Sequence, residues 1–139
     1  MTRAFAYCRK LSDFTNTTLL HNKNNKVTSM AMSFYSCFLF PLTVSNIIDT
    51  FLYFDSSRNE EITSLSYAFS EMRSGIKNNS TWTLNLNKLT PNITTMHYAF
   101  SNTNLGSISN KIAEGSKLTD ANNCFASNKN LSSIPEGIF

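Results

Sequence analysis

The chain has 139 residues and a formal net charge of +3, from 12 Lys and Arg against 9 Asp and Glu. That length favours one domain, and 41% apolar residues are enough for a continuous core of modest width. Only 15% of the residues are charged, and the lysines are scattered and do not cluster with arginine and aromatic residues. No nucleic-acid partner is therefore expected.

A short phrase built around a phenylalanine returns five times along the chain. It occupies Met1–Cys8, Val27–Cys37, Ile62–Phe69, Ile93–Phe100 and Leu118–Phe125. The four later copies share an apolar residue, then Thr, then Met, Leu or Ala two positions on, and finally the Phe. A unit this short cannot bury its apolar face alone, so neighbouring copies are expected to stack and share one core. The predicted core residues are Phe5, Met30, Phe34, Leu65, Phe69, Met96, Phe100 and Phe125.

Each unit changes its apolar period from helix-like to strand-like. Ile93, Met96 and Phe100 lie at i, i+3 and i+7, which predicts a short helix that a neighbouring Thr or Asn could cap. Trp82–Leu89 alternates with period two, which is typical of a strand, and three further short strands are expected at Leu11–Phe14, Leu105–Ile108 and Leu131–Ile134. The sequence thus predicts an α/β solenoid, a leucine-rich-repeat-like coil whose strands form a parallel ladder. Its five units would span residues 1–26, 27–61, 62–92, 93–117 and 118–139.

Several of these phrases resemble the BspA-type bacterial leucine-rich repeats. The resemblance is carried by Phe5, Cys8, Leu11 and Phe14, by the Tyr-Ala-Phe of Tyr67–Phe69 and Tyr98–Phe100, and by the closing Leu131–Phe139. It touches all five units, although only Cys8 and Cys37 hold the cysteine that the family often carries after the Phe. Such repeats occur in bacterial surface proteins, mycoplasma lipoproteins and some phage proteins. The resemblance implies a recognition or adhesion role at a cell surface, or alternatively a place in a virion.

The residues that carry chemistry form no constellation typical of an enzyme or a metal site. Glu60 and Glu61 are adjacent and point apart, and no Gly-rich phosphate loop or nucleophile elbow is present. His21 and His97 have no ligand partners at metal-binding spacing. We therefore expect no catalytic activity, no metal and no cofactor. Cys8 and Cys37 hold equivalent places in neighbouring units, where a ladder of buried thiols is favoured and a disulfide is the alternative.

Two further features bear on location. Val27–Ile48 contains no charged residue, but its many Ser and Thr residues and Pro41 favour a buried core segment over a membrane-spanning helix. Met1–Lys10 lacks an apolar signal region, so a surface location would require a signal outside this chain. Because the first copy lacks its apolar-Thr pair and the chain stops at Ile134–Phe139, we predict either a piece of a longer solenoid or a chain whose open ends are capped by partner chains.

Recognition of a protein or a glycan by the exposed strand face is the predicted function. An intracellular scaffold is a third possibility, which the absence of a signal would favour. The expected ligand-binding residues are mostly small and polar, with a tryptophan as an aromatic anchor. They are Ser12, Asp13, Trp82, Thr83, Asn85, Asn87, Ser107, Ser109 and Ser132.

Overall fold

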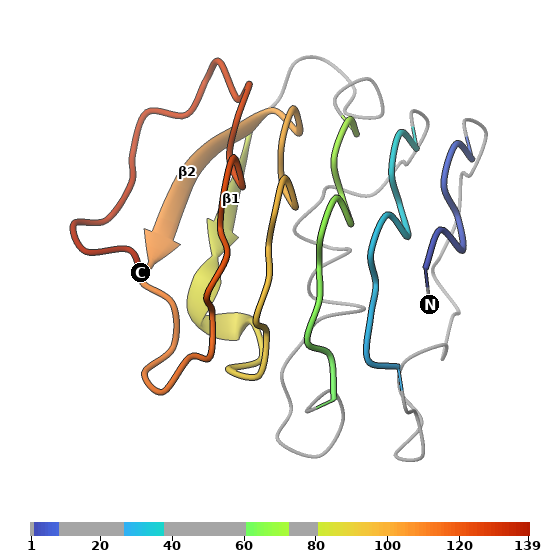
Figure 1. The fold of residues 1–139 in the computed structure, drawn as a ribbon. Helices are drawn as coiled ribbons and strands as arrows, with labels where there is room; N and C mark the ends of the chain where they lie inside the picture. Colours follow the sequence, from blue (N-terminus) through green and yellow to red (C-terminus); the bar gives the residue numbers. More distant parts are fainter. Residues whose placement is uncertain (1, 9–26, 38–60, 73–80) are drawn as a thin grey trace.

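In the computed structural model, residues 2–8, 27–37, 61–72 and 81–139 are described. Segments built of consecutive tight turns lie side by side along one face, in the order of the sequence (Figure 1). They comprise residues 2–8, 27–37, 61–72, 93–103 and 119–128, each around one of the five repeated phenylalanines. We call this arrangement the turn stack. Strands β1 (Trp82–Asn85) and β2 (Leu105–Asn110) and the 3-10 helix η4 (Leu86–Lys88) lie on its other side.

The prediction of a five-unit solenoid of helices and strands is wrong. The described residues contain no α-helix, and their only strands are the two short ones, β1 and β2, which pair in parallel. Leu131–Ile134, which was expected to be a strand, contributes a single bridge between Ser107 and Ser133. The expected strand at Leu11–Phe14 lies outside the described residues.

The segments expected to be helical are chains of turns. In the third segment the amide of Ala68 donates to the carbonyl of Leu65 at 2.8 Å, and that of Ser70 donates to Tyr67 at 3.3 Å. Tyr67 and Glu71 have φ angles of 56° and 63°, whereas an α-helix needs negative φ at every residue. Buried apolar side chains recur about every three residues, a spacing that both a helix and such turns satisfy. Periodicity alone therefore could not separate the two.

The left-handed conformation recurs at fixed positions. In all five segments the second residue before the Phe and the second residue after it have positive φ. The positions before the Phe are Arg3, Met32, Tyr67, Tyr98 and Asn123, and those after it are Tyr7, Ser36, Glu71, Asn102 and Ser127. None of these ten residues is glycine, so the contacts between segments must offset the cost of this backbone conformation.

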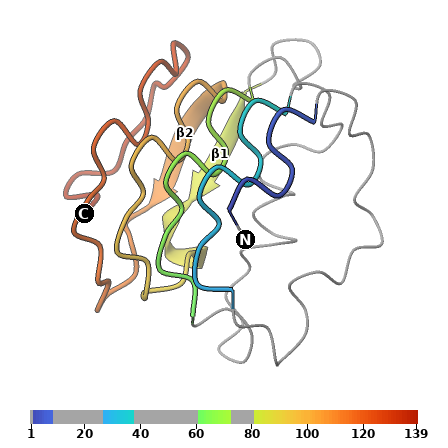
Figure 2. The ribbon, with the colours of Figure 1, turned by 45° about the vertical axis from the view of Figure 1, so that its right-hand side comes forward.

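Around each phenylalanine, backbone hydrogen bonds join a segment to the next one along the stack, and these bonds all point in the same direction. Phe34, for example, donates its amide to the carbonyl of Ala68 at 2.8 Å, and Phe69 donates to Ala99 at 3.0 Å. In the first four segments the residues two before and two after the Phe donate in the same way, as Met32 does to Ser66 at 2.9 Å. Figure 2 shows the segments running in parallel. The ladder replaces the intrahelical bonds that a helix would have made.

The repeated threonine adds further hydrogen bonds between neighbouring segments, and these bonds point in the opposite direction. Thr63, Thr94 and Thr119 each donate both the backbone amide and the side-chain hydroxyl to the carbonyl of the threonine one segment earlier. The three hydroxyl bonds are each 3.1 Å long. The prediction that this threonine caps a helix is wrong, because it bonds across segments and no α-helix follows it in the described residues.

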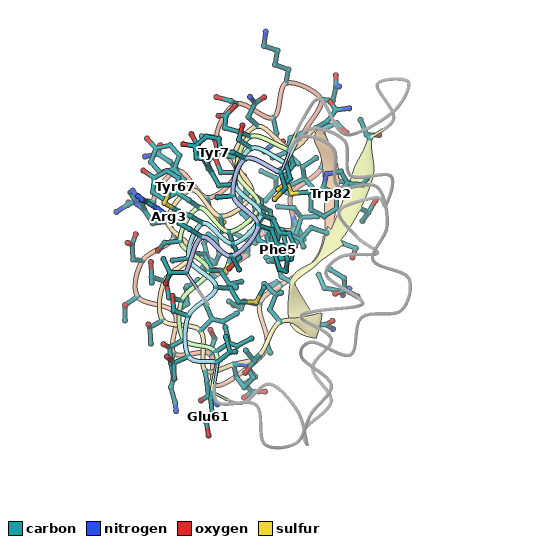
Figure 3. The ribbon with its side chains drawn as sticks, turned by 90° about the vertical axis from the view of Figure 1, so that its right-hand side faces the viewer. Arg3, Phe5, Tyr7, Glu61, Tyr67 and Trp82 are labelled. Carbon is teal, nitrogen blue, oxygen red and sulfur yellow. The ribbon has the colours of Figure 1, made fainter. Side chains whose placement is uncertain are left out.

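The core lies between the turn stack and the strands. Successive phenylalanine rings are stacked, with ring centroids 5.6 Å apart for Phe34 and Phe69 and 5.5 Å apart for Phe69 and Phe100. Of the eight predicted core residues, Phe5 and Phe125 are partly buried, and the others are fully buried with 0% of their surface exposed. Figure 3 views the molecule from one end, with Phe5 and Trp82 pointing into this interior.

Candidate recognition surface

The strand face holds polar residues that the sequence singled out, and they form hydrogen bonds to each other and to neighbouring residues of the same face. The Thr83 and Ser107 hydroxyl oxygens are 2.7 Å apart, and the Asn110 side-chain amide donates to Asn85 at 3.0 Å. The Ser132 hydroxyl donates to the carbonyl of Gly106 at 3.2 Å. Because these groups already have partners within the chain, few of their donors are left for a ligand.

The remaining predicted binding residues are less closely grouped. Ser109 is exposed, and its hydroxyl oxygen lies 3.5 Å from the carbonyl oxygen of Leu84. Asn87 is exposed in η4, beyond the end of β1. Trp82, expected to be an aromatic anchor at the surface, is buried with 6% exposed, and its indole N–H donates to the carbonyl of Thr103 at 2.9 Å. Ser12 and Asp13 lie outside the described residues.

A row of aromatic side chains runs along the opposite face, on the outside of the turn stack. Tyr7 and Tyr35 meet edge to face with ring centroids 5.4 Å apart, and Tyr35 and Tyr67 do so at 6.3 Å. Tyr67 and Tyr98 are stacked at 5.0 Å, and His97 packs edge-on against both. We call these five residues the tyrosine row. In Figure 3, Tyr7 and Tyr67 point away from β1 and β2.

The tyrosine row is partly exposed and is formed by four consecutive segments. Tyr7 is 58% exposed and the other rings are half-buried. Tyr67 and Tyr98 both stand two residues before their phenylalanines, so the ladder that aligns the backbones also brings their rings together. Tyr7 and Tyr35 follow their phenylalanines instead. The sequence reasoning missed this surface, although a tyrosine within two residues of the Phe in four of the five copies was a visible signal.

Charged and polar groups border the tyrosine row. The Arg3 guanidinium Nε lies 3.3 Å from the Met32 sulfur, and His97 Nδ1 lies 3.8 Å from a carboxylate oxygen of Asp120. The Asn102 side chain donates to Glu71 at 2.7 Å. Partial burial, and to a lesser degree the neighbouring Tyr7 and Glu71, raise the pKa of Tyr35. The Tyr35 hydroxyl is therefore a neutral hydrogen-bonding group at physiological pH.

The cysteines are free thiols, so the alternative of a Cys8–Cys37 disulfide is not realised. The buried Cys37 thiol donates to the carbonyl of Phe5 at 2.8 Å, and burial raises its pKa to about 11. Burial also raises the pKa of Cys124. Both thiols therefore stay protonated near neutral pH and make poor nucleophiles.

The part of the chain that the structure describes contains neither a metal site nor a membrane-spanning helix. Within it, no three His, Cys, Asp or Glu side chains are grouped so that they could hold a metal ion. No helix there has the length and apolar character needed to cross a membrane. Residues 27–37 of the uncharged stretch form one of the turn segments, and its remainder, 38–48, lies outside the described residues.

No protein-family model, curated protein or solved structure matches the chain. The resemblance to BspA-type repeats therefore stays a prediction.

Proposed function

We propose that this chain is a non-enzymatic recognition module that binds a protein partner through the tyrosine row. The observation that carries the proposal is the continuity of the row, in which four tyrosines and a histidine from successive segments form one partly exposed surface. Tyrosine offers a large rigid contact area and a hydroxyl at a low cost in conformational entropy, which is why it is enriched at binding sites.

The arrangement of the rings favours a protein over a glycan. A sugar ring binds best on an open aromatic face, yet Tyr67 and Tyr98 cover one face of each other, with planes only 7° apart. What the stacked pair offers is ring edges and hydroxyl groups, which suit the side chains and backbone of a polypeptide. Arg3 and Glu71 beside the row add one charge of each sign, which would help to orient a partner.

Selection from an unbiased displayed peptide library tests the proposal, because selected binders concentrate on surfaces rich in binding energy. The test variant is Tyr67→Asn with Tyr98→Asn, since Asn123 already holds this left-handed position in the fifth segment. We expect the selected peptides to bind the variant at least about tenfold more weakly. The matched control is Asn87→Ala on the other face, which should bind as the unaltered chain does.

Peptides that bind the tyrosine variant and the unaltered chain equally well would contradict the proposal. A parallel glycan array addresses the alternative ligand: glycan binding that the tyrosine variant loses would replace the protein partner by a sugar. A role in adhesion, with the protein at a cell surface or in a virion, is part of the proposal that rests on the sequence resemblance.

A further inference from the structure

We propose that copies of this chain associate head to tail through the two ends of the turn stack. The starting observation is the one-way ladder. At every internal junction the amides of the Phe and of the residues two before and two after it donate to carbonyls of the following segment. Between the second and third segments, for example, Met32, Phe34 and Ser36 donate to the third segment at 2.8 to 2.9 Å.

The two ends of the stack are therefore chemically complementary. At the first segment the carbonyls of Ala4 and Ala6 hold the places where Ser33 and Tyr35 accept bonds in the second segment, and no described residue donates to them. At the fifth segment the amides of Asn123, Phe125 and Ser127 hold the donor places, and no acceptor for them lies in the described part. One end offers acceptors and the other offers donors, at the spacing used inside the chain.

Both ends already have the conformation that a junction requires. Arg3 and Tyr7 at the acceptor end have φ angles of 57° and 62°, and Asn123 and Ser127 at the donor end have 54° and 60°. The internal junctions use the same left-handed values. Association would therefore form the amide bonds that surround the Phe at an internal junction, though not the threonine bonds, which the first segment lacks. Little rearrangement of the backbone would be needed, which lowers the entropic cost of association. A second copy of this chain is the partner that fits both edges at once.

The phenylalanine row indicates how this association is restrained. The ring of Phe139 stacks on that of Phe125, with centroids 6.2 Å apart and planes 3° apart, and continues the row by one ring. Phe5 of an incoming copy would take this place, because among the described residues Phe5 is the first ring of the row, and it stacks on Phe34 at 5.3 Å. Phe139 is 57% exposed, so its ring is bound only weakly to Phe125. It would compete with Phe5 of the second copy for the same position on the Phe125 ring.

Ala4 gives a specific way to block the junction. It is exposed in the single chain, but the equivalent Ala68 and Ala99 at internal junctions are 0% exposed. Ala4→Glu would therefore be tolerated in the monomer and would place an unpaired carboxylate in the joined interface. The same charge at the exposed Asn87, in the variant Asn87→Glu, is the matched control because η4 is on the strand side of the molecule and is not part of the turn stack.

Sedimentation velocity over about a hundredfold range of protein concentration tests the inference, because association follows mass action. We expect the 139-residue chain to form oligomers that grow with concentration and are not limited to dimers, since a head-to-tail dimer keeps one donor end and one acceptor end for further copies. Ala4→Glu should weaken association at least about a hundredfold. Phe139→Ala should strengthen it about tenfold by removing the competing ring. Asn87→Glu should change nothing.

A mixing experiment distinguishes head-to-tail contact from a symmetric one. A chain with Ala4→Glu keeps its donor end, so it should still bind the acceptor end of an unaltered chain and terminate the oligomer. The inference is overturned if the unaltered chain and Phe139→Ala are both monomeric at every concentration, or if Ala4→Glu leaves association intact. The tyrosine row lies along the side of the stack, so either result leaves the proposed recognition role untouched.

Discussion

The Thr94 hydroxyl and the Thr94 amide both donate to the carbonyl of Thr63, at 3.1 and 2.8 Å. The same carbonyl also accepts from the amide of Thr95 at 3.3 Å. This relationship explains why a threonine stands at the same place in consecutive copies: its side chain extends the bonding between segments that the backbone begins.

Replacing Thr94 by valine, which has nearly the same shape, should lower the free energy of unfolding by about 0.5–1.5 kcal/mol through loss of this hydrogen bond. Thr94→Ser keeps the hydroxyl and should lose clearly less. Urea denaturation of the two variants measures the difference. If the serine variant lost as much stability as the valine variant, the hydroxyl bond would not be the stabilising feature.

Phe100→Ala should cost about 3–5 kcal/mol of stability, since it opens a cavity in the middle of the core. Phe100 is 0% exposed, stacks on Phe69, and contacts Phe125 and Trp82 with ring centroids 6.3 and 6.1 Å away. Asn85→Ala, which removes only a surface hydrogen bond to Asn110, should cost less than about 1 kcal/mol. Similar losses in the denaturation midpoints of the two variants would contradict the assignment of the core.

Ser127→Gly should raise the free energy of unfolding by up to about 1 kcal/mol, because Ser127 has a φ of 60° that glycine adopts without strain. The neighbouring Ala126 does not have a positive φ angle. Ala126→Gly should therefore lower the free energy of unfolding by about 0.5–1 kcal/mol. Thermal denaturation of the pair checks the opposite signs. Shifts in the same direction would argue against a left-handed backbone at Ser127.

Gly106→Ala should destabilise the β1–β2 side by about 1–3 kcal/mol through a steric clash. An added Cβ at Gly106 would lie 2.6 Å from the Cβ of Thr81, closer than real contacts allow. The double variant with Thr81→Gly removes that atom and should recover part of the loss. A double-mutant cycle in chemical denaturation measures the coupling, and strictly additive losses would rule out the contact as the cause.

The Cys37 thiol should make stability fall at alkaline pH. Folding raises the pKa of this thiol from 9.0 to about 11. Above pH 9 the unfolded chain therefore loses the thiol proton more readily than the folded chain does. The unfolded state is favoured increasingly as the pH rises toward about 11. Cys37→Ser keeps a donor for the carbonyl of Phe5 but does not titrate. The denaturation midpoint of the unaltered chain should therefore fall more steeply between about pH 8 and about pH 10.5 than that of the variant. Equal slopes would contradict a buried, protonated Cys37.

Some of this structure could be predicted from sequence, and particular residues show where prediction stops. The alignment of Phe34, Phe69 and Phe100 in one row follows from the recurrence of the phrase. The turns could not be inferred, because Met32 and Tyr67 are residues that ordinarily avoid positive φ, and only the ladder between segments holds them there. Local periodicity contains no information about bonds to a segment some thirty residues away.

The candidate site was predicted less well than the row of phenylalanines. Trp82 was expected at the surface, although it shares its alternation with Leu84, and both are buried in β1. Tyr35 and Tyr67 gain importance only when the ladder places their segments side by side, which the sequence spacing does not reveal. The hydrogen bonds of the polar strand residues, such as those between Thr83 and Ser107 and between Asn85 and Asn110, could not be predicted because they depend on the parallel register of β1 and β2.

The one-way ladder also gives the turn stack an electrical polarity. Most amide-to-carbonyl bonds between segments point the same way along the stack, and the fewer threonine bonds oppose them. As in an α-helix, aligned peptide dipoles add. The end where the amides of Asn123 and Phe125 find no acceptor among the described residues is therefore relatively positive, and the end where the carbonyls of Ala4 and Ala6 find no donor among them is relatively negative. Each further segment would lengthen this macrodipole through its backbone alone, so the stack can orient in the field of a neighbour whatever side-chain charges it carries.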